Sequence, residues 1–400
     1  MRLTIISPYP TSAVTEMSDS RDSALNWYTR RLAGAIASQG VEVSVIAPIG
    51  DGASRLRWQD GNVVVIPCYR RGSATAALSM MTAAAETRAE IIHVQHELFA
   101  YGGLPTATVL PFCLRHLRRC GLKVFTTIHG VIPLEAITPE FVHANRIFGP
   151  VWGVRYIWRQ LIRNVALASN AVHVHEAYLG DLLVEQYGIH QNSIRVIPMG
   201  IDRNTNVSLR EIARERFSIP PEAEVVLFFG YMSTYKGLVQ LTAAIPAALK
   251  RRSKLHFVLA GAVPARLRGT NDVREQLHVD GVDRDRIHIT GFVSDQAIPH
   301  VFAASDVLLL PYTVVMSASG PMALAISHDV PVLLSDRFSN AYPAAPGMFV
   351  PEPGQITDAV CSFFEDTARQ AACRAFVRSL AAERTWPAVA RAFINVYENL

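Results

Sequence analysis

The chain has 400 residues, of which half are hydrophobic and 18% are charged, and its formal net charge is +4. This length exceeds what one hydrophobic core usually fills, so we expect two domains, and the small net charge argues against a nucleic-acid partner. The five cysteines form no C-x-x-C pair, so neither a zinc site nor a disulfide framework is indicated. Scattered, unpaired cysteines fit a cytoplasmic protein.

The first half of the chain alternates between β-rich runs and helical patterns. Residues 2–7 are an apolar run before Pro8, which predicts a first strand rather than a signal peptide. Residues 25–40 place apolar side chains on one face and end at a glycine, which predicts a helix. Further strands are expected at 41–48, 63–68, 91–97, 123–130 and 171–176. This alternation predicts a doubly wound α/β domain with a parallel sheet.

Histidines follow three of the predicted strands of this sheet. They stand at His96, which precedes Glu97, at His129, and at His175, which precedes Glu176. In such sheets ligands bind beyond the carboxyl ends of the strands. One histidine there is usually structural, but three at the same edge indicate a pocket.

A second α/β series follows a polar linker region. The linker is expected at 204–224, and residues 149–169 before it form a basic, aromatic helix. We expect that helix to pack on the sheet, with contact to a membrane surface as the alternative. The strands of the second series are expected at 225–230, 255–261, 286–293, 306–312 and 330–335, and an amphipathic helix is expected at 385–400.

Residues 311–336 join the last two of these strands through a tight loop and a short helix. Ser319 or Gly320 would cap the helix, and Pro321 suits its first position. The backbone N–H groups of Met322 and Ala323 would then be unpaired. Such a helix N-terminus can bind phosphate, whereas the alternative is an ordinary capped helix of the core.

Four segments together carry a family resemblance. They are VIPMGID (196–202), FFGYMSTYKGL (228–238), ITGFVSDQAIPHVFAASDVLLLPY (289–312) and SGPMALAISHDVPVL (319–333). The chain resembles family 4 of the retaining glycosyltransferases (GT4) over almost its whole length. The resemblance implies the GT-B fold, in which two Rossmann-like, doubly wound domains face each other across a cleft.

The same resemblance implies the division of the chain. Residues 1–205 would form the acceptor-side domain and residues 206–384 the domain that binds the nucleotide sugar. Residues 385–400 would form a helix that packs back on the N-terminal domain.

The resemblance also implies roles for individual residues. Lys236 matches the lysine that meets the donor diphosphate and His129 the histidine that contacts the transferred sugar, so both are expected to be catalytic. The expected donor-binding residues are Gly230, Tyr231, Ser233, Lys236, Gly261, Gly291, Phe292, Val293, Ser319, Gly320, Met322 and Ala323. On the acceptor side, the candidates are Asp22, His96, Glu97 and Glu176.

Several positions depart from the pattern of the family. Most members carry two glutamates eight residues apart, which would fall at Met316 and Leu324. The usual arginine before the lysine is Tyr231, and the usual Gly-Gly of the first loop is Ser23-Ala24. Part of this is shared by a subgroup with Ser-Gly in place of the first glutamate. The donor contacts are therefore expected to differ from the usual ones.

The expected activity is retaining transfer of a sugar from a nucleotide-diphosphate sugar to a glycan, a lipid carrier or a small metabolite. No metal or other cofactor is expected. The alternative is a non-catalytic or repurposed GT-B protein, such as a sugar-nucleotide-binding subunit, a pseudo-glycosyltransferase or an epimerase-like enzyme. A dehydrogenase is disfavoured, because no G-x-G-x-x-G follows either first strand. The expected location is the cytoplasm, with weak peripheral contact to the inner face of the membrane as an option.

Overall fold

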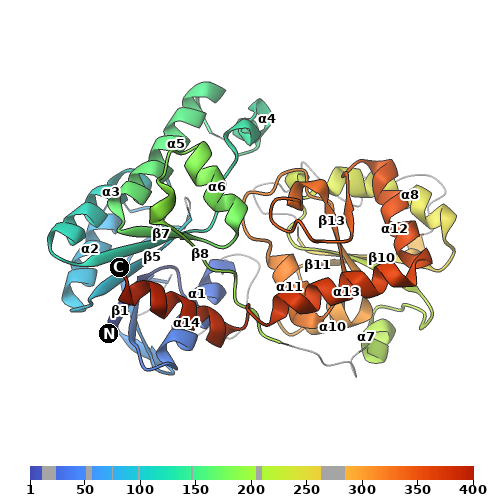
Figure 1. Cartoon of the computed structure of the whole chain (residues 1–400), viewed down its shortest axis with the longest axis horizontal. Helices are drawn as coiled ribbons and strands as arrows, with labels where there is room; N and C mark the ends of the chain where they lie inside the picture. The colour runs from blue at the N-terminus through green and yellow to red at the C-terminus, as the bar shows by residue number, and fades with distance from the viewer. Residues whose placement is uncertain are drawn as a thin grey trace.

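The computed structural model describes residues 1–10, 24–50, 56–73, 75–97, 100–145, 147–203, 210–262 and 284–400. Two α/β lobes lie side by side, each built around its own largely parallel sheet (Figure 1). This arrangement confirms the predicted fold class. The expected boundary near residue 205 falls within 204–209, which lies outside the described residues.

The N-terminal sheet has eight strands in the order β3-β4-β2-β1-β5-β6-β7-β8. They are β1 (Arg2–Ile6), β2 (Glu42–Pro48), β3 (Trp58–Asp60), β4 (Val63–Tyr69), β5 (Ile91–His96), β6 (Lys123–Ile128), β7 (Ala171–Val174) and β8 (Ile194–Val196). Strand β3 runs antiparallel to β4, and the other pairs are parallel. The strands read as apolar runs because helices cover both faces of the sheet.

Those covering helices come from both ends of the chain. They are α1 (Ala24–Ala37), α2 (Ala76–Glu86), α3 (Leu104–Arg119), α4 (Pro139–Ala144), α5 (Val151–Ala168), α6 (Ala177–Glu185) and the C-terminal α14 (Trp386–Glu398). Helices α1 and α14 share one core cluster with the sheet, and α2, α3 and α5 share another. Helix α14 therefore lies in the N-terminal lobe beside α1, although the chain reaches it from the C-terminal lobe (Figure 1).

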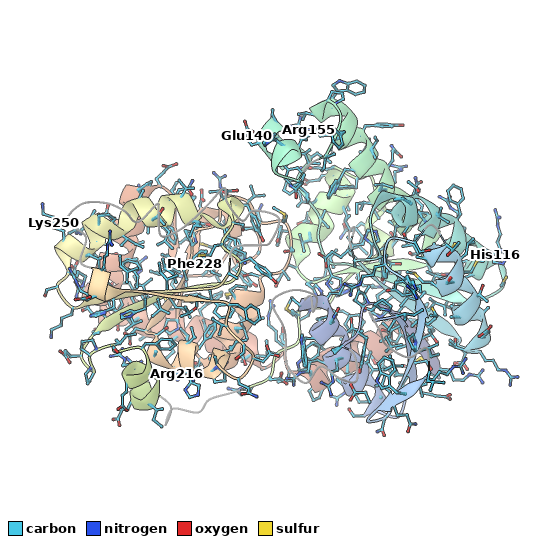
Figure 2. The ribbon with its side chains drawn as sticks, turned by 180° about the vertical axis from the view of Figure 1, so that it is seen from behind. His116, Glu140, Arg155, Arg216, Phe228 and Lys250 are labelled. Atoms are coloured by element: carbon cyan, nitrogen blue, oxygen red, sulfur yellow. The ribbon has the colours of Figure 1, made fainter. Side chains whose placement is uncertain are left out.

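The C-terminal sheet has six strands in the order β11-β10-β9-β12-β13-β14. They are β9 (Glu224–Phe229), β10 (Leu255–Ala260), β11 (Ile287–Gly291), β12 (Val307–Leu310), β13 (Val332–Ser335) and β14 (Met348–Phe349). Its helices are α7 (Arg210–Arg216), α8 (Leu238–Arg251), α10 (Ile298–Ala304), α11 (Gly320–His328), α12 (Pro353–Glu365) and α13 (Thr367–Ala381). Figure 2 shows Phe228 of β9 inside this lobe, where its side chain is fully buried.

The chain passes between the lobes twice, around Ile201 and around Arg384, and these two connecting segments lie side by side. The N–H of Ile201 donates to the carbonyl oxygen of Arg384 over 2.6 Å, and Ile201 also forms a β-bridge with Thr385. A second contact joins the loop after β6 to the loop before α11, through a bridge between Gly130 and Ser317. The lobes are thus joined at two places.

Two segments between the lobes' sheets show how the elements compare with the sequence-based expectations. In the segment 194–202, whose sequence indicates a strand followed by a glycine turn, the strand ends at Val196, because Pro198 and Gly200 interrupt the ladder. The expected linker contains a helix, α7, whose Arg214 donates to Asp306 and is buried against α10. The charged sequence of α7 is typical of a linker. The carboxylate that allows its arginine to be buried stands 92 residues further along the chain, so the sequence of α7 alone does not reveal the helix.

Candidate active site

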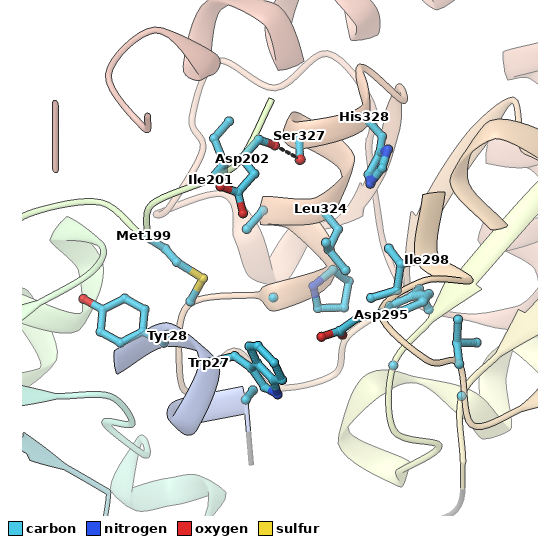
Figure 3. A pocket seen from close by; sticks show the side chains of 18 of the residues that line it. Trp27, Tyr28, Met199, Ile201, Asp202, Asp295, Ile298, Leu324, Ser327 and His328 are labelled. Atoms are coloured by element: carbon cyan, nitrogen blue, oxygen red, sulfur yellow. Dashed lines mark hydrogen bonds between the residues drawn. The ribbon is translucent and has the colours of Figure 1, made fainter. Parts of the chain in front are cut away.

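A cavity of about 540 Å³ lies between the two lobes (Figure 3). This volume is in the range of small-molecule sites. Eight of the residues expected to bind a donor line it, namely Gly230, Tyr231, Lys236, Gly261, Phe292, Val293, Gly320 and Ala323. The C-terminal ends of β9, β10 and β11 and the start of α11 supply them. The sequence therefore located one wall of this cavity.

Lys236 is a buried cation without a counter-ion in the described part of the chain. It ends a short 3-10 turn after β9 and is 8% exposed. Its Nζ lies 5.7 Å from the ring centroid of Tyr312, and burial lowers its pKa. A buried charge without a partner is costly, so this site favours an incoming anion.

Gly230 keeps the space around this lysine open. Its φ is +117°, and a Cβ at this position would come within 2.5 Å of Lys236 Nζ. It would also lie 3.4 Å from Cγ of Pro321, at the start of α11. Gly230, Lys236 and Pro321 therefore meet at one point of the cavity wall.

The start of α11 differs from the expectation in its hydrogen bonding. The N–H of Met322 donates to Ser319 Oγ over 3.3 Å, and the N–H of Ala323 donates to Ser319 O over 3.0 Å. These two amides are therefore not unpaired, because the serine that caps the helix accepts from both. The positive end of the helix dipole still points at the cavity through Gly320.

Four of the expected donor residues do not line the cavity. Ser233, Ser319 and Met322 are buried, and Gly291 ends β11. Ser233 Oγ has no hydrogen-bond partner within the described ranges. We infer that Ser319 acts on the site through the helix start that it caps.

Met316 and Leu324, which stand where glutamates are usual in the family, lie in different surroundings. Leu324 lines the cavity. The carbonyl oxygen of Met316 accepts from the N–H of Val131 over 2.8 Å, next to the bridge between Gly130 and Ser317. The first position is therefore part of the contact between the lobes, and the second presents an apolar surface to the cavity.

His129 lies behind the cavity wall. Its Nε2 is 2.7 Å from Gln95 Oε1, and its Nδ1 is 3.2 Å from Nε2 of His175. Tyr28, which lines the cavity, meets the rings of His129 and His175 edge-on, at 5.1 and 5.2 Å between centroids. Both ring nitrogens of His129 thus have protein partners, and Tyr28 lies next to its ring.

The acceptor-side candidates lie in different environments. His96 is buried and Glu97 is exposed, whereas Asp22 lies outside the described residues. Glu176 forms a buried ion pair with Arg384 at 3.0 Å and accepts from the hydroxyl of Tyr342 at 2.9 Å. These contacts give Glu176 a structural role between the lobes.

The buried histidines predict a stability that depends on pH. Burial lowers the pKa of His93 to about 3 and the pKa of His96 and of His175 to about 4. An unfolded histidine titrates near about 6.5, so between these values the unfolded chain binds more protons. Stability is full above about pH 6.5 and is lost as the pH falls toward the folded values, by up to about 1.4 kcal/mol per pH unit for each histidine.

We therefore expect the melting temperature to fall steadily from about pH 7 to about pH 5. His116, which is exposed on α3 at the outer edge of the lobe (Figure 2), offers a control. The variant His116→Asn should keep the same pH profile. A melting temperature that stays level across this interval would contradict the expectation.

Several lining residues were not expected from the sequence. They come from α1, from the connecting segment around Ile201 and from the start of α14. They are Trp27, Tyr28, Arg31, Met199, Ile201, Asp202 and Trp386. The sequence offered a signal for Trp27, which is a large aromatic residue next to the predicted apolar face of the helix at 25–40. Met199, Ile201 and Asp202 belong to VIPMGID (196–202), one of the segments that carry the family resemblance, whereas the place of Trp386 depends on how the lobes meet.

Comparison with known proteins gives matches along most of the chain. A family model described as Glycosyltransferase Family 4 matches residues 25–205. A second model, described as Glycosyl transferases group 1, matches residues 223–366. The two matches fall on the two lobes.

Two curated relatives illustrate the level of similarity. Mannosylfructose-phosphate synthase from Agrobacterium fabrum is 29% identical over 138 residues, which are 32% of this chain and 30% of that protein. D-inositol 3-phosphate glycosyltransferase from Kineococcus radiotolerans is 22% identical over 99% of this chain and 94% of its own length.

Solved structures match over the whole chain. Sucrose-phosphate synthase from Thermosynechococcus elongatus has a TM-score of 0.74 at 17% identity, over 100% of this chain and 98% of its own. HepE from Anabaena, solved in complex with UDP and glucose, has a TM-score of 0.68 at 15% identity, over 100% of both chains. These likenesses show a shared fold.

Proposed function

This chain belongs to glycosyltransferase family 4, the retaining transferases with the GT-B fold, and from that premise we propose that it transfers a hexose from a nucleoside-diphosphate sugar. The acceptor class is a glycan, a lipid carrier or a small metabolite. The observation that carries the proposal is Lys236, a buried cation with no carboxylate partner among the described residues, at the wall of the cavity between the lobes.

In the proposed reaction the diphosphate of the donor lies against Lys236 and the start of α11. Negative charge builds on the diphosphate as the bond to the anomeric carbon breaks, and the cation and the helix dipole stabilise it. The acceptor hydroxyl attacks from the face that the diphosphate leaves, and the departing phosphate oxygen takes its proton. His129 serves the sugar side of the site, once the Tyr28 ring beside it moves.

We also propose that the chain belongs to the subgroup in which Ser-Gly replaces the first glutamate. Ser319 and Gly320 are the Ser-Gly pair of this chain, three residues after Met316, where the first glutamate would fall. Leu324 stands where the second glutamate is usual, so donor hydroxyls are bound by other groups. The domain division at residues 205 and 384 and the roles of the expected donor residues belong to the same proposal.

Uridine diphosphate sugars are the first donors to test, because a structural relative was solved with UDP and glucose. The full chain is incubated with UDP-glucose, GDP-mannose or dTDP-glucose, with and without pooled glycan, lipid and metabolite acceptors. We expect one donor to release nucleoside diphosphate faster when acceptor is present. NMR of the product should show that the anomeric configuration of the donor is retained. Binding without release under any condition would favour the non-catalytic alternative.

Peripheral contact with a membrane is a further proposal, resting on the tip of α5. In the described part of the chain no helix is both long and apolar enough to cross a bilayer. Trp152 and Tyr156, one turn apart on α5, are 75% and 61% exposed, and Phe148, just before the helix, is 98% exposed. Exposed aromatic side chains of this kind suit the interface of a bilayer.

The arginines of α5 predict that this contact depends little on lipid charge. Arg155 donates to the carbonyl oxygen of Ile137 over 3.1 Å, and Arg159 donates to that of Gln186 over 2.7 Å. We expect weak co-sedimentation with phosphatidylcholine vesicles, with little gain when anionic phosphatidylglycerol is added.

Changing the three aromatic residues of this tip to serine should abolish the sedimentation. Phe112→Ser, on α3 and 67% exposed in the parent chain, is the control that should keep it. Equal sedimentation of the triple variant and the parent would refute the contact.

A further inference from the structure

Trp27 of α1 lines the cavity from the N-terminal lobe, together with the aromatic side chains of Tyr28 and Trp386. Figure 3 shows Trp27 rising from α1 toward Asp295, Ile298 and Leu324, which belong to the opposite lobe. Its indole N–H is buried and has no acceptor within the described ranges. The cavity that the ring lines is bounded on its other side by the segment after β11 and by α11.

A charged framework holds the Trp27 ring from outside this cavity. The guanidinium carbon of Arg30 lies 5.5 Å from the ring centroid. Arg30 donates to both carboxylate oxygens of Asp60, over 2.7 and 3.1 Å, and Tyr9 donates to the same carboxylate over 2.9 Å. Arg30 and Asp60 line a neighbouring cavity of about 520 Å³, which Trp27 also borders. One face of the indole is thus covered by a cation that is itself fixed.

The wall opposite Trp27 is mostly apolar. Phe292, Val293, Ile298, Pro299 and Leu324 line it. A flat aromatic ring on one side and an apolar wall on the other form a slot that suits a planar, weakly polar group. Lys236 lines the same cavity, so an anionic group joined to that planar group could reach it.

We propose that Trp27 is the N-terminal lobe's half of a clamp on the base of the donor nucleotide, whose diphosphate lies at Lys236. The inference rests on the proposed function and adds a specificity-determining residue to it. The base stacks on the indole, which Arg30 holds in place. Because the clamp takes one side from each lobe, binding of the base also draws the lobes together.

The test compares a ligand that has a base with one that lacks it. The full chain and its variants Trp27→Ala, Trp27→Phe and Lys236→Met are titrated with UDP, GDP, ADP, dTDP and inorganic pyrophosphate by calorimetry. Stacking of a base on an aromatic side chain predicts that Trp27→Ala weakens the best nucleoside diphosphate by about tenfold or more, with Trp27→Phe nearer the parent. Pyrophosphate should bind Trp27→Ala as it binds the parent, whereas Lys236→Met should lose both ligands.

Fluorescence gives an independent readout, because the chain has five tryptophans. The nucleoside diphosphate should quench the emission of the parent and of Trp152→Phe, a control at an exposed site. It should quench that of Trp27→Phe less than that of the parent, because Trp386, which also lines the cavity, remains in this variant. Unchanged affinity of Trp27→Ala for the nucleoside diphosphate, or an equal loss for pyrophosphate, would overturn the clamp while leaving the transferase proposal intact. If the parent bound none of the four nucleoside diphosphates, the proposed function would fail and the clamp with it.

Discussion

Replacing Lys236 with methionine is expected to lower kcat/KM by at least about a hundredfold, as the loss of one preorganised charge-stabilising group does in other enzymes. Nucleoside diphosphate binding should fall below detection in the same variant. Methionine keeps the length and most of the volume of the lysine, so the change removes mainly the charge. The buried side chain has no carboxylate partner in the described residues, so its charge is available for the ligand.

The same substitution is expected to leave the empty protein at least as stable as before. Burial lowers the pKa of Lys236, so the folded chain holds this proton less tightly than the unfolded chain does. The parent therefore gains stability as the pH rises from the lowered pKa toward about 10.5, and the variant lacks this gain. Near neutral pH the variant is relieved of a buried charge, and its melting temperature should be equal or higher.

Lys250→Met is the matched control for this experiment. Lys250 is exposed on α8, at the outer edge of the C-terminal lobe (Figure 2). Activity and nucleotide binding of this control should match the parent. Loss of activity in Lys236→Met together with a fall in its melting temperature would point to misfolding instead of a lost diphosphate contact.

Breaking the ion pair between Glu176 and Arg384 is expected to destabilise the protein strongly. The two side chains are 9% exposed each and lie 3.0 Å apart. Arg384→Met leaves a buried carboxylate whose remaining partner is the hydroxyl of Tyr342. Removing one member of such a pair typically costs about 3–5 kcal/mol. The cost should appear in urea titration as a lower midpoint.

A second substitution should restore most of this loss. In Glu176→Leu/Arg384→Met both charges are replaced by apolar groups of similar volume, which often recovers the stability of a buried pair. Arg378→Met is the control, because Arg378 pairs with Asp329 on the surface, where ion pairs contribute little. If Arg384→Met melted like the parent, the interlobe role of Glu176 would be refuted and its acceptor-side role would regain support.

The sequence predicted those features that depend on short stretches of chain. Lys236 and Gly230 belong to one strand–turn segment, and the apolar runs of β9 and β12 identify buried strands without any knowledge of their neighbours. The cap at Ser319 was also predicted, but the hydrogen bonds that the N–H groups of Met322 and Ala323 donate to its side-chain and backbone oxygens were not.

Contacts between distant segments explain what the sequence did not predict. Glu176 reads as a strand-end carboxylate, and its partner Arg384 stands 208 residues further along the chain. The role of Trp27 emerges in the same way, because the wall opposite it comes from the other lobe. Strand β3 is three residues long at the sheet edge, which is too short for its alternation to stand out.

The central claim is that the cavity between the lobes binds a nucleoside diphosphate through Lys236 and the start of α11. Its most direct test is calorimetric titration of the parent chain with UDP, GDP, ADP and dTDP at one fixed salt concentration. We predict that one of the four binds once per chain with micromolar affinity and that inorganic pyrophosphate competes with it. The account would be contradicted if none of the four nucleoside diphosphates bound below millimolar concentration. It would also be contradicted if one bound and pyrophosphate did not compete with it.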